Sequence, residues 1–145
     1  MAVATTYLAS PGFQIGTSSA SLKNLTDQCR SVVVTKSREA LDQSSFGDSG
    51  RQFVGGLTNV TVTATLLMEY SSTPRTYVDL TGLVGTRCTV HVIANANAAI
   101  SATNPEMQVV GGYFESLDVV NGSVGELSEV EITITGGTLT EDVTP

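Results

Sequence analysis

The chain has 145 residues, of which 41% are hydrophobic and only 14% are charged, and its formal net charge is −7. This length fits one domain with its own hydrophobic core, so we expect a single domain over residues 1–145. An acidic chain with only seven Lys and Arg residues lacks the clustered cations of a nucleic-acid-binding protein, which excludes that class.

The cysteine content and the hydropathy of the chain further restrict the kind of protein that this sequence can encode. Cys29 and Cys88 are the only cysteines, and without a CxxC spacing they predict two small buried side chains, not a zinc site or a disulfide. The N-terminus has no basic-then-apolar signal, and no apolar stretch approaches membrane-spanning length. We therefore expect a soluble protein, made in a reducing compartment, with no membrane partner.

The first thirty residues predict only short elements. Residues 1–12 form an apolar and polar lead, which we expect to be an N-terminal arm that pairs with a neighbouring chain or frays. Residues 13–15 predict a short strand that ends in a turn. Residues 22–30 predict a helical turn with Leu22 and Leu25 facing inward.

Two strand patterns flank a long polar segment in the middle of the chain. Residues 31–37 open with three valines, and residues 59–70 alternate between apolar side chains and Asn or Thr. Residues 38–57 lie between them, and this connection is far longer than a hairpin tip. It carries the apolar residues Phe46, Phe53, Val54 and Leu57. We therefore expect an extended loop that docks on another surface.

The second half of the chain predicts one helix and three strands. Thr73-Pro74 predicts a helix start, and Tyr77, Leu80 and Val84 recur on one helical face that ends at Gly85. The strand patterns cover residues 87–94, 106–120 and 129–135, with a bend at Gly111-Gly112, a turn at Asn121-Gly122 and a C-terminal tail over residues 137–145. The sum is a mainly β fold, either an antiparallel β-sandwich or a partly closed barrel. One short flanking α-helix and the long inter-strand loop complete it.

Residues for catalysis or metal binding are sparse. His91 is the only histidine, and its mid-strand position predicts a surface side chain instead of part of a catalytic pair. Asp48 and Arg51 predict a charged pair within the loop. The glycines of this loop do not form a phosphate-binding motif. We expect no enzyme activity, no catalytic residue, no metal and no cofactor.

The loop carries a recurring motif, EALDQSSFGDSGRQFVGGL, which resembles a segment of the tail tube (major tail) proteins of long-tailed bacteriophages. The matching positions are Ala40, Leu41, Asp42, Phe46, Gly47, Asp48, Arg51, Phe53, Gly56 and Leu57. Two weaker echoes follow in family order, at residues 83–86 with 100–105 and at residues 122–127. Together they cover most of residues 31–136.

The resemblance implies a structural virion protein whose subunits form six-membered rings stacked into a hollow tube. It implies that sheets of neighbouring subunits join around the lumen, that the loop reaches an adjacent ring and that the helix lies on the flank. The inter-ring contacts would then be Leu41, Asp42, Phe46, Gly47, Asp48, Arg51, Phe53 and Leu57, and candidate lumen-facing residues are Thr61, Thr63, Glu129 and Glu131. The net negative charge of the chain fits a conduit for DNA, because it repels the phosphates and so disfavours their binding.

The implied partners are further copies of the chain, a tape-measure protein and other tail proteins, with non-specific passage of DNA. The implied location is the phage tail, after synthesis in the host cytoplasm. Two alternatives stay open: a capsid decoration or tail-completion protein of related fold, and a carbohydrate-binding β-sandwich module. A lectin would more often expose aromatic residues, and this chain has no Trp and four Tyr.

Overall fold

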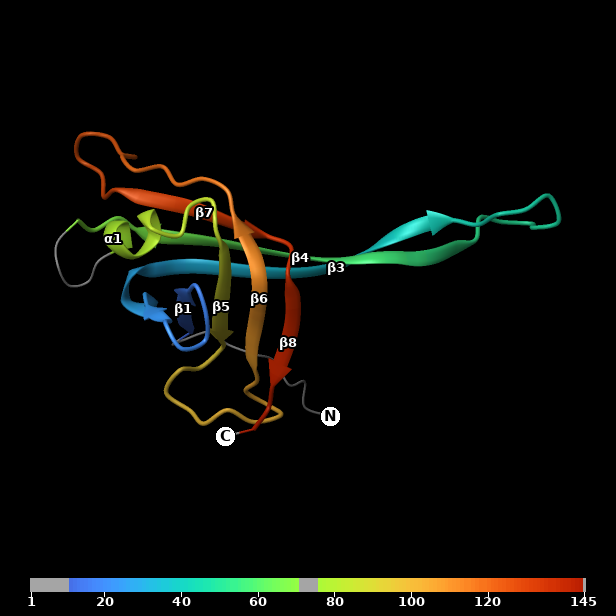
Figure 1. The fold of residues 1–145 in the computed structure, drawn as a ribbon, viewed down its shortest axis with the longest axis horizontal. Coiled ribbons are helices and arrows are strands. Elements are labelled where there is room, and N and C mark those ends of the chain that lie inside the picture. Colours follow the sequence, from blue (N-terminus) through green and yellow to red (C-terminus); the bar gives the residue numbers. More distant parts are fainter. Residues whose placement is uncertain (1–10, 71–75, 145) are drawn as a thin grey trace.

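The computed structural model describes residues 11–70 and 76–144. Figure 1 shows the fold in these ranges, which is mainly β with one short α-helix, as the sequence predicts. The strands are β1 (Gly12–Gly16), β2 (Lys23–Asn24), β3 (Cys29–Asp42), β4 (Phe53–Leu67), β5 (Arg87–Ile93), β6 (Glu106–Phe114), β7 (Glu129–Thr135) and β8 (Thr138–Asp142). The helices are α1 (Thr76–Thr81) and a 3₁₀ turn (Thr26–Gln28).

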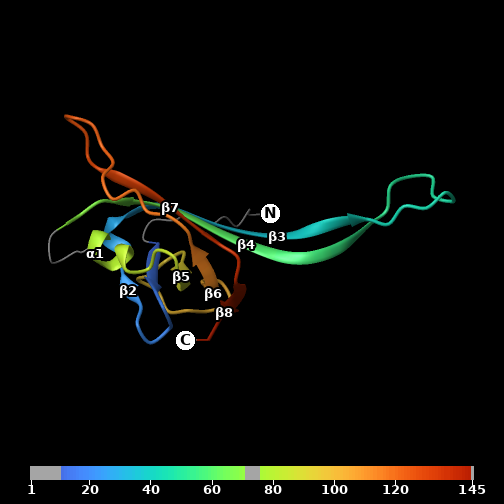
Figure 2. The ribbon, with the colours of Figure 1, turned by 45° about the horizontal axis from the view of Figure 1, so that its top comes forward.

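All eight strands belong to one antiparallel sheet that does not close. Its order is β2-β1-β5-β6-β7-β4-β3, and β8 pairs with the first half of β6. The sheet curves so that the strands of the β1–β5–β6 part run across those of the β3–β4–β7 part (Figures 1 and 2). The expected sandwich or partly closed barrel is therefore a single open sheet folded over on itself.

The core lies between these two parts of the sheet. Val60, Val62, Ala64 and Leu66 of β4 are buried, as the alternation of β4 predicts. They pack in one cluster with side chains of the facing part, the largest being Phe13, Ile15 and Phe114. Burying each large side chain of this kind contributes about 1.5–3 kcal/mol. The alternation of β7 is also confirmed, because Val130, Ile132 and Ile134 are fully buried.

Two glycines make the corner where the sheet changes direction. A Cβ on Gly112 would lie 2.5 Å from Cγ2 of Ile134, so β6 and β7 approach there more closely than a side chain allows. Gly137, between β7 and β8, has φ +86°, and its Cβ would lie 2.5 Å from the Val110 carbonyl oxygen. The predicted bend at Gly111-Gly112 is confirmed by a register shift opposite it in β5 and by φ +82° at Gly111.

Three predicted boundaries are wrong. The strand expected over 106–120 ends at Phe114, and residues 115–128 form a long loop in place of a tight turn at Asn121-Gly122. The expected C-terminal tail over 137–145 contains β8, which pairs with Glu106–Val110 of β6. The glycines at 136 and 137 end one strand and turn the chain into another, so they do not end the sheet.

The shorter elements differ in detail. The expected helical turn over 22–30 is the short strand β2 followed by the 3₁₀ turn, and Leu25 is buried as predicted. Helix α1 ends at Thr81, before Gly85, whose amide donates to the Phe114 carbonyl instead of capping the helix. The expected helix start at Thr73-Pro74 and residues 1–10 of the expected N-terminal arm lie outside the described residues.

Candidate functional site

The segment expected as an extended loop is a β-hairpin arm that projects from the body (Figure 1). The β3–β4 ladder continues outward to the pairs Leu41–Val54 and Asp42–Phe53, so only residues 43–52 form a turn region. The prediction of a loop over 38–57 is wrong in this respect, because both faces of the arm are exposed and its paired residues, Leu41 and Val54 among them, lack the alternation of apolar and polar side chains of a core strand. We call residues 38–57 the arm.

Arg38 stiffens the base of the arm. The register between β3 and β4 shifts between Arg38 and Ala40, which marks a bulge. At this point the Arg38 side chain lies over Gly55, and its Nε donates a 3.0 Å hydrogen bond to the Gly56 carbonyl. A Cβ on Gly55 would lie 2.4 Å from that Nε, so the glycine makes room for the guanidinium. This explains the glycine at position 55 within a strand.

The tip of the arm is a hydrogen-bonded turn that presents Phe46. Asp48 closes it, because its Oδ2 accepts hydrogen bonds from the Ser45 amide at 2.7 Å and the Ser45 hydroxyl at 3.1 Å. The Asp48 amide donates to the Ser45 carbonyl at 3.0 Å. Phe46 and Gly47 lie between these residues, and the Phe46 side chain is fully exposed. The structure gives no steric reason for glycine at 47, where an added Cβ would meet nothing within 4 Å.

The predicted pair between Asp48 and Arg51 is not formed. Arg51 instead lies 3.9 Å from Oδ2 of Asp42, and both side chains are largely exposed, so this ion pair contributes little. Asp42 Oδ1 accepts a 2.9 Å hydrogen bond from the Ser44 amide. Hydrogen bonds from the Ser44 side chain and amide lower the pKa of Asp42 below its ordinary value. Asp42 and Asp48 therefore organise the tip, and Arg51 presents its charge to solvent.

Apolar side chains are exposed all along the arm. The exposed fractions are 44% for Leu41, 112% for Phe46, 54% for Phe53, 46% for Val54 and 81% for Leu57. Soluble monomers seldom expose several large apolar side chains together, and such groups mark interaction surfaces. The structure brings all eight predicted contact residues onto this one hairpin, and their contacts with another subunit stay a prediction.

The four candidate lumen residues share one face of the sheet. Thr61 pairs with Thr135 and Thr63 with Thr133, and Glu131 lies opposite Thr65 on the same side. Side chains on this side of β3, β4 and β7 are mostly hydroxyls, and we call this surface the hydroxyl face: Ser31, Thr35, Ser37, Thr61, Thr63, Thr65, Thr133 and Thr135. Glu131 is exposed on it, whereas Glu129 is half-buried and forms an ion pair with Arg30.

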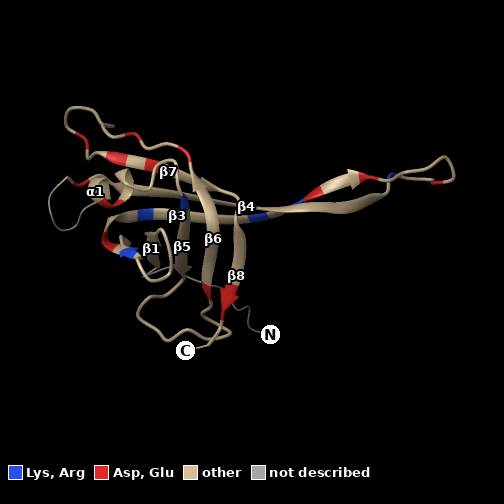
Figure 3. Ribbon diagram, viewed as in Figure 1, with Lys and Arg blue, Asp and Glu red and all other residues tan. Residues whose placement is uncertain are grey.

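A second apolar surface lies in the loop over residues 115–128, at the end of the molecule opposite the arm (Figures 1 and 2). The exposed fractions are 83% for Val120, 105% for Val124 and 73% for Leu127. The weaker tail-tube-like motif at residues 122–127 lies in this loop. The strand expected up to Val120 includes the first part of the loop, so the sequence does not predict its full length. Figure 3 shows acidic residues along this loop and at the start of β7.

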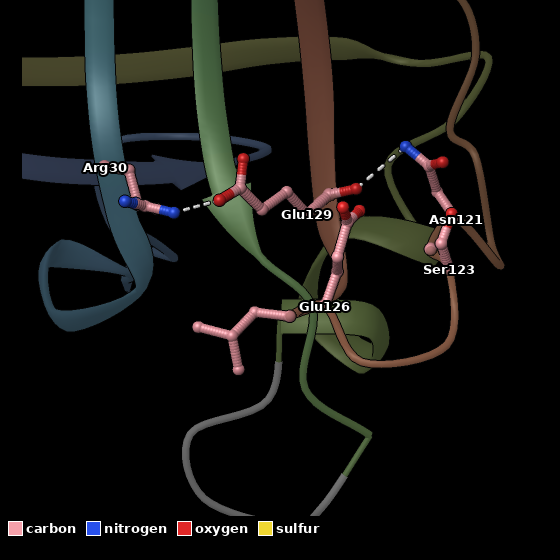
Figure 4. A pocket seen from close by; sticks show the side chains of 7 residues that line it. Arg30, Asn121, Ser123, Glu126 and Glu129 are labelled. Carbon is pink, nitrogen blue, oxygen red and sulfur yellow. Dashed lines mark hydrogen bonds and ion pairs between the residues drawn. The ribbon is translucent and has the colours of Figure 1, made fainter.

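A hollow of about 450 Å³ lies between this loop and the sheet (Figure 4). Its lining residues are Arg30, Asn121, Gly122, Ser123, Glu126, Leu127 and Glu129. The Arg30–Glu129 ion pair forms its floor, and Asn121 Nδ2 donates a 2.9 Å hydrogen bond to the Glu129 carbonyl. Two carboxylates and one guanidinium make the hollow acidic.

The prediction of a surface position for His91 is wrong. Its side chain is only 11% exposed, and it lines a hollow together with residues of β1 and of the 96–100 loop. Nδ1 lies 3.0 Å from Oε1 of Glu106, and Nε2 is buried without a partner among the described residues.

The two cysteines are free, and Cys88 is buried as predicted, whereas Cys29 is only half-buried. Burial raises the pKa of both thiols. In the parts of the chain that the structure describes, no group of three or more His, Cys, Asp or Glu side chains could hold a metal ion. Within the same ranges, no helix has the length and apolar character needed to cross a membrane.

Similarity to known proteins is found in structure alone, because no family model and no curated protein sequence matches the chain. A chain of the SPP1 tail tube superposes with TM-score 0.71 at 11% identity, over 92% of this chain and 77% of that one. The chain has the fold of a tail tube protein. A chain from the tail of an empty gene transfer agent particle, solved with C6 symmetry, gives TM-score 0.70 at 15% identity, over 94% and 98% of the two chains.

A chain from the virion of a native gene transfer agent particle gives TM-score 0.69 at 13% identity, and it covers 96% of this chain and 100% of that one. The tail-tube-like fold therefore extends over nearly the whole sequence. It includes the regions that the sequence motifs of the arm do not cover. At these identities the similarity concerns the fold, and function has to be argued from the surfaces described above.

Proposed function

We propose that the protein is a structural subunit of a phage-like tail tube, which assembles with further copies of itself into stacked rings around a lumen for DNA. The single observation that carries this proposal is the arm. A paired hairpin that leaves the body and exposes Phe46, Phe53 and Leu57 has no use in an isolated subunit, whereas it provides anchors for a contact with the next ring.

The hydroxyl face supports the same proposal as the lining of the lumen. Its Ser and Thr side chains are uncharged, and Glu131 repels phosphate, so DNA slides past without specific binding. Thr61, Thr63, Glu129 and Glu131 are the residues we assign to this lining. In such a tube the Arg30–Glu129 ion pair removes one acidic charge from the face, and the repulsion comes mainly from Glu131.

The open edges of the sheet support ring formation. The described sheet has free edges at β2 and β3, and an unpaired edge binds readily to a strand of another chain. Subunits related by rotation join such edges into a ring. The proposal also includes a tape-measure protein and other tail proteins as partners, location in the virion tail after synthesis in a host cytoplasm, and a function without enzyme activity. Nothing in the described residues favours the decoration, completion or carbohydrate-binding alternatives.

Self-assembly of the purified protein tests this proposal. We expect hollow tubes of uniform diameter in negative-stain electron microscopy above a critical concentration, with six-fold end views. Replacing residues 41–54 with Asn-Gly should leave a folded monomer, because a two-residue turn then closes the hairpin at the Ala40–Gly55 pair. That variant should form no tubes. Wild-type protein that stays monomeric at all concentrations would contradict the proposal, as would normal tubes from the shortened variant.

A further inference from the structure

We infer that the acidic hollow beside the 115–128 loop is the receptor for the arm tip of a second copy, with Phe46 against Leu127 and Arg51 facing Glu126. This inference rests on the proposed function and names the surface that the arm contacts.

Exposure singles out the two surfaces. Among the described residues, Phe46 at 112% and Val124 at 105% are the two large apolar side chains with the greatest exposure. One lies on the arm tip and the other on the 115–128 loop. The apolar side chains beside Val124 are Val120 and Leu127, so the loop offers a patch that an aromatic anchor can cover.

Position makes the two surfaces compatible in a repeating assembly. The arm leaves one end of the β4 strand direction, and the loop that precedes β7 lies at the other end in both views (Figures 1 and 2). A contact between unlike surfaces at opposite ends of a subunit is heterologous, and repeated along one direction it builds a stack of any length. A contact between the arms of two subunits would instead use the same surface on both and would end in a dimer.

Arg51 is complementary in charge to the acidic hollow, although Asp42 and Asp48 leave residues 41–54 of the arm with a net charge of −1. Residues 115–128 contain Glu115, Asp118 and Glu126 and no Lys or Arg. Among the described residues no group donates to the Glu126 carboxylate, which points toward Glu129 in the hollow (Figure 4). On the arm tip, Asp48 is tied into the turn, and the Arg51 side chain is 78% exposed.

The size and chemistry of the hollow fit an aromatic side chain. A volume of about 450 Å³ lies within the usual range of binding pockets, so one phenyl ring fits with solvent to spare. The Arg30 guanidinium lines the hollow and offers a cation to the face of a ring. The Leu127 side chain supplies the apolar wall.

A charge exchange tests the pairing. Arg51→Glu and Glu126→Lys should each raise the critical concentration for tube assembly by about tenfold or more, because each places like charges together. The double variant should return it to within about threefold of wild type. As a matched control, Arg51→Glu combined with Glu141→Lys on exposed β8 should show no recovery.

The outcomes separate the two proposals. If wild-type protein forms tubes but Glu126→Lys assembles normally, or the exchange gives no recovery, the receptor is elsewhere and only this inference falls. If wild-type protein forms no tubes, both fall. A second measurement does not depend on charge: a photo-crosslinking benzoylphenylalanine at position 46 should label residues 115–128 of another copy. Labelling of the apolar hollow lined by Val34, Val92 and Met107 would instead overturn the assignment.

Discussion

Replacing Phe46 and Phe53 together by alanine should strongly weaken tube assembly while leaving the subunit folded. Phe46 is fully exposed, so the folded subunit gains almost nothing from its ring, whereas Phe53 is 54% exposed and its half-burial contributes about 1 kcal/mol to folding. Substitutions at exposed positions usually change the free energy of unfolding by less than about 0.5 kcal/mol. For a domain of this size we therefore expect the melting temperature to fall by only about 2–4 °C.

The same rings should dominate the contact between subunits. Fully burying a Phe side chain contributes about 1.5–3 kcal/mol, and a ring already half-buried contributes about half of that. Burial of both on docking then amounts to about 2–4.5 kcal/mol for each arm. Since 1.4 kcal/mol corresponds to a factor of ten, the double variant should raise the critical concentration by roughly 40- to 10³-fold.

Sedimentation of tubes across a concentration series measures this critical concentration, and differential scanning calorimetry of unassembled protein measures the melting temperature. Val78→Ala on α1 is the control, because Val78 is 45% exposed and lies away from the arm. An unchanged critical concentration would show that the rings are not anchors. A melting temperature lowered by more than about 5 °C would show that they mainly stabilise the subunit itself.

Three further predictions concern stability, pH and DNA passage. In urea denaturation, Gly137→Ala should lower the free energy of unfolding by more than Gly125→Ala does. Both glycines have positive φ, which costs an alanine about 1–2 kcal/mol at either site. Only at Gly137 does the new Cβ also collide with a backbone atom, the Val110 carbonyl oxygen. Because the pKa of Asp42 is lowered in the fold, its contribution to the tip is complete at neutral pH and lost as pH falls through that lowered value, so the Ser44 amide resonance should shift in acid and stay constant in Asp42→Asn. Glu131→Lys should slow DNA ejection from assembled particles without preventing assembly, and unchanged ejection rates would place this face away from the lumen.

The sequence predicts the core well, because alternation is a property of each strand alone. Buried and exposed side chains alternate along β4 and β7, and Val62 and Ile132 lie in the core as the period of two requires. The order of strands in the sheet depends instead on pairings between distant segments, such as β1 with β5. No local pattern specifies these pairings.

The errors arise where strands lack that alternation. The arm is paired over Ala40–Gly55 and beyond, but both its faces meet solvent, so its side chains carry no burial signal. Strand β8 is short and follows two glycines, a pattern that predicts the end of the last strand. The polar strand neighbours of His91 predict a surface position, yet its side chain is only 11% exposed and faces Glu106 and the loop that follows its own strand. In each case the residues of the strand alone do not show which segment pairs with it or lies over it.

The placement of the arm and the acidic hollow at opposite ends of the subunit has a consequence for a finished tube. A stack built by inserting each arm into the next copy is polar: one terminus displays a crown of unengaged arms, and the other displays vacant acidic hollows. The two termini would bind different capping proteins, one acidic and concave, the other bearing an aromatic and basic prong. Growth could then be started at one terminus and stopped at the other by partners that never compete.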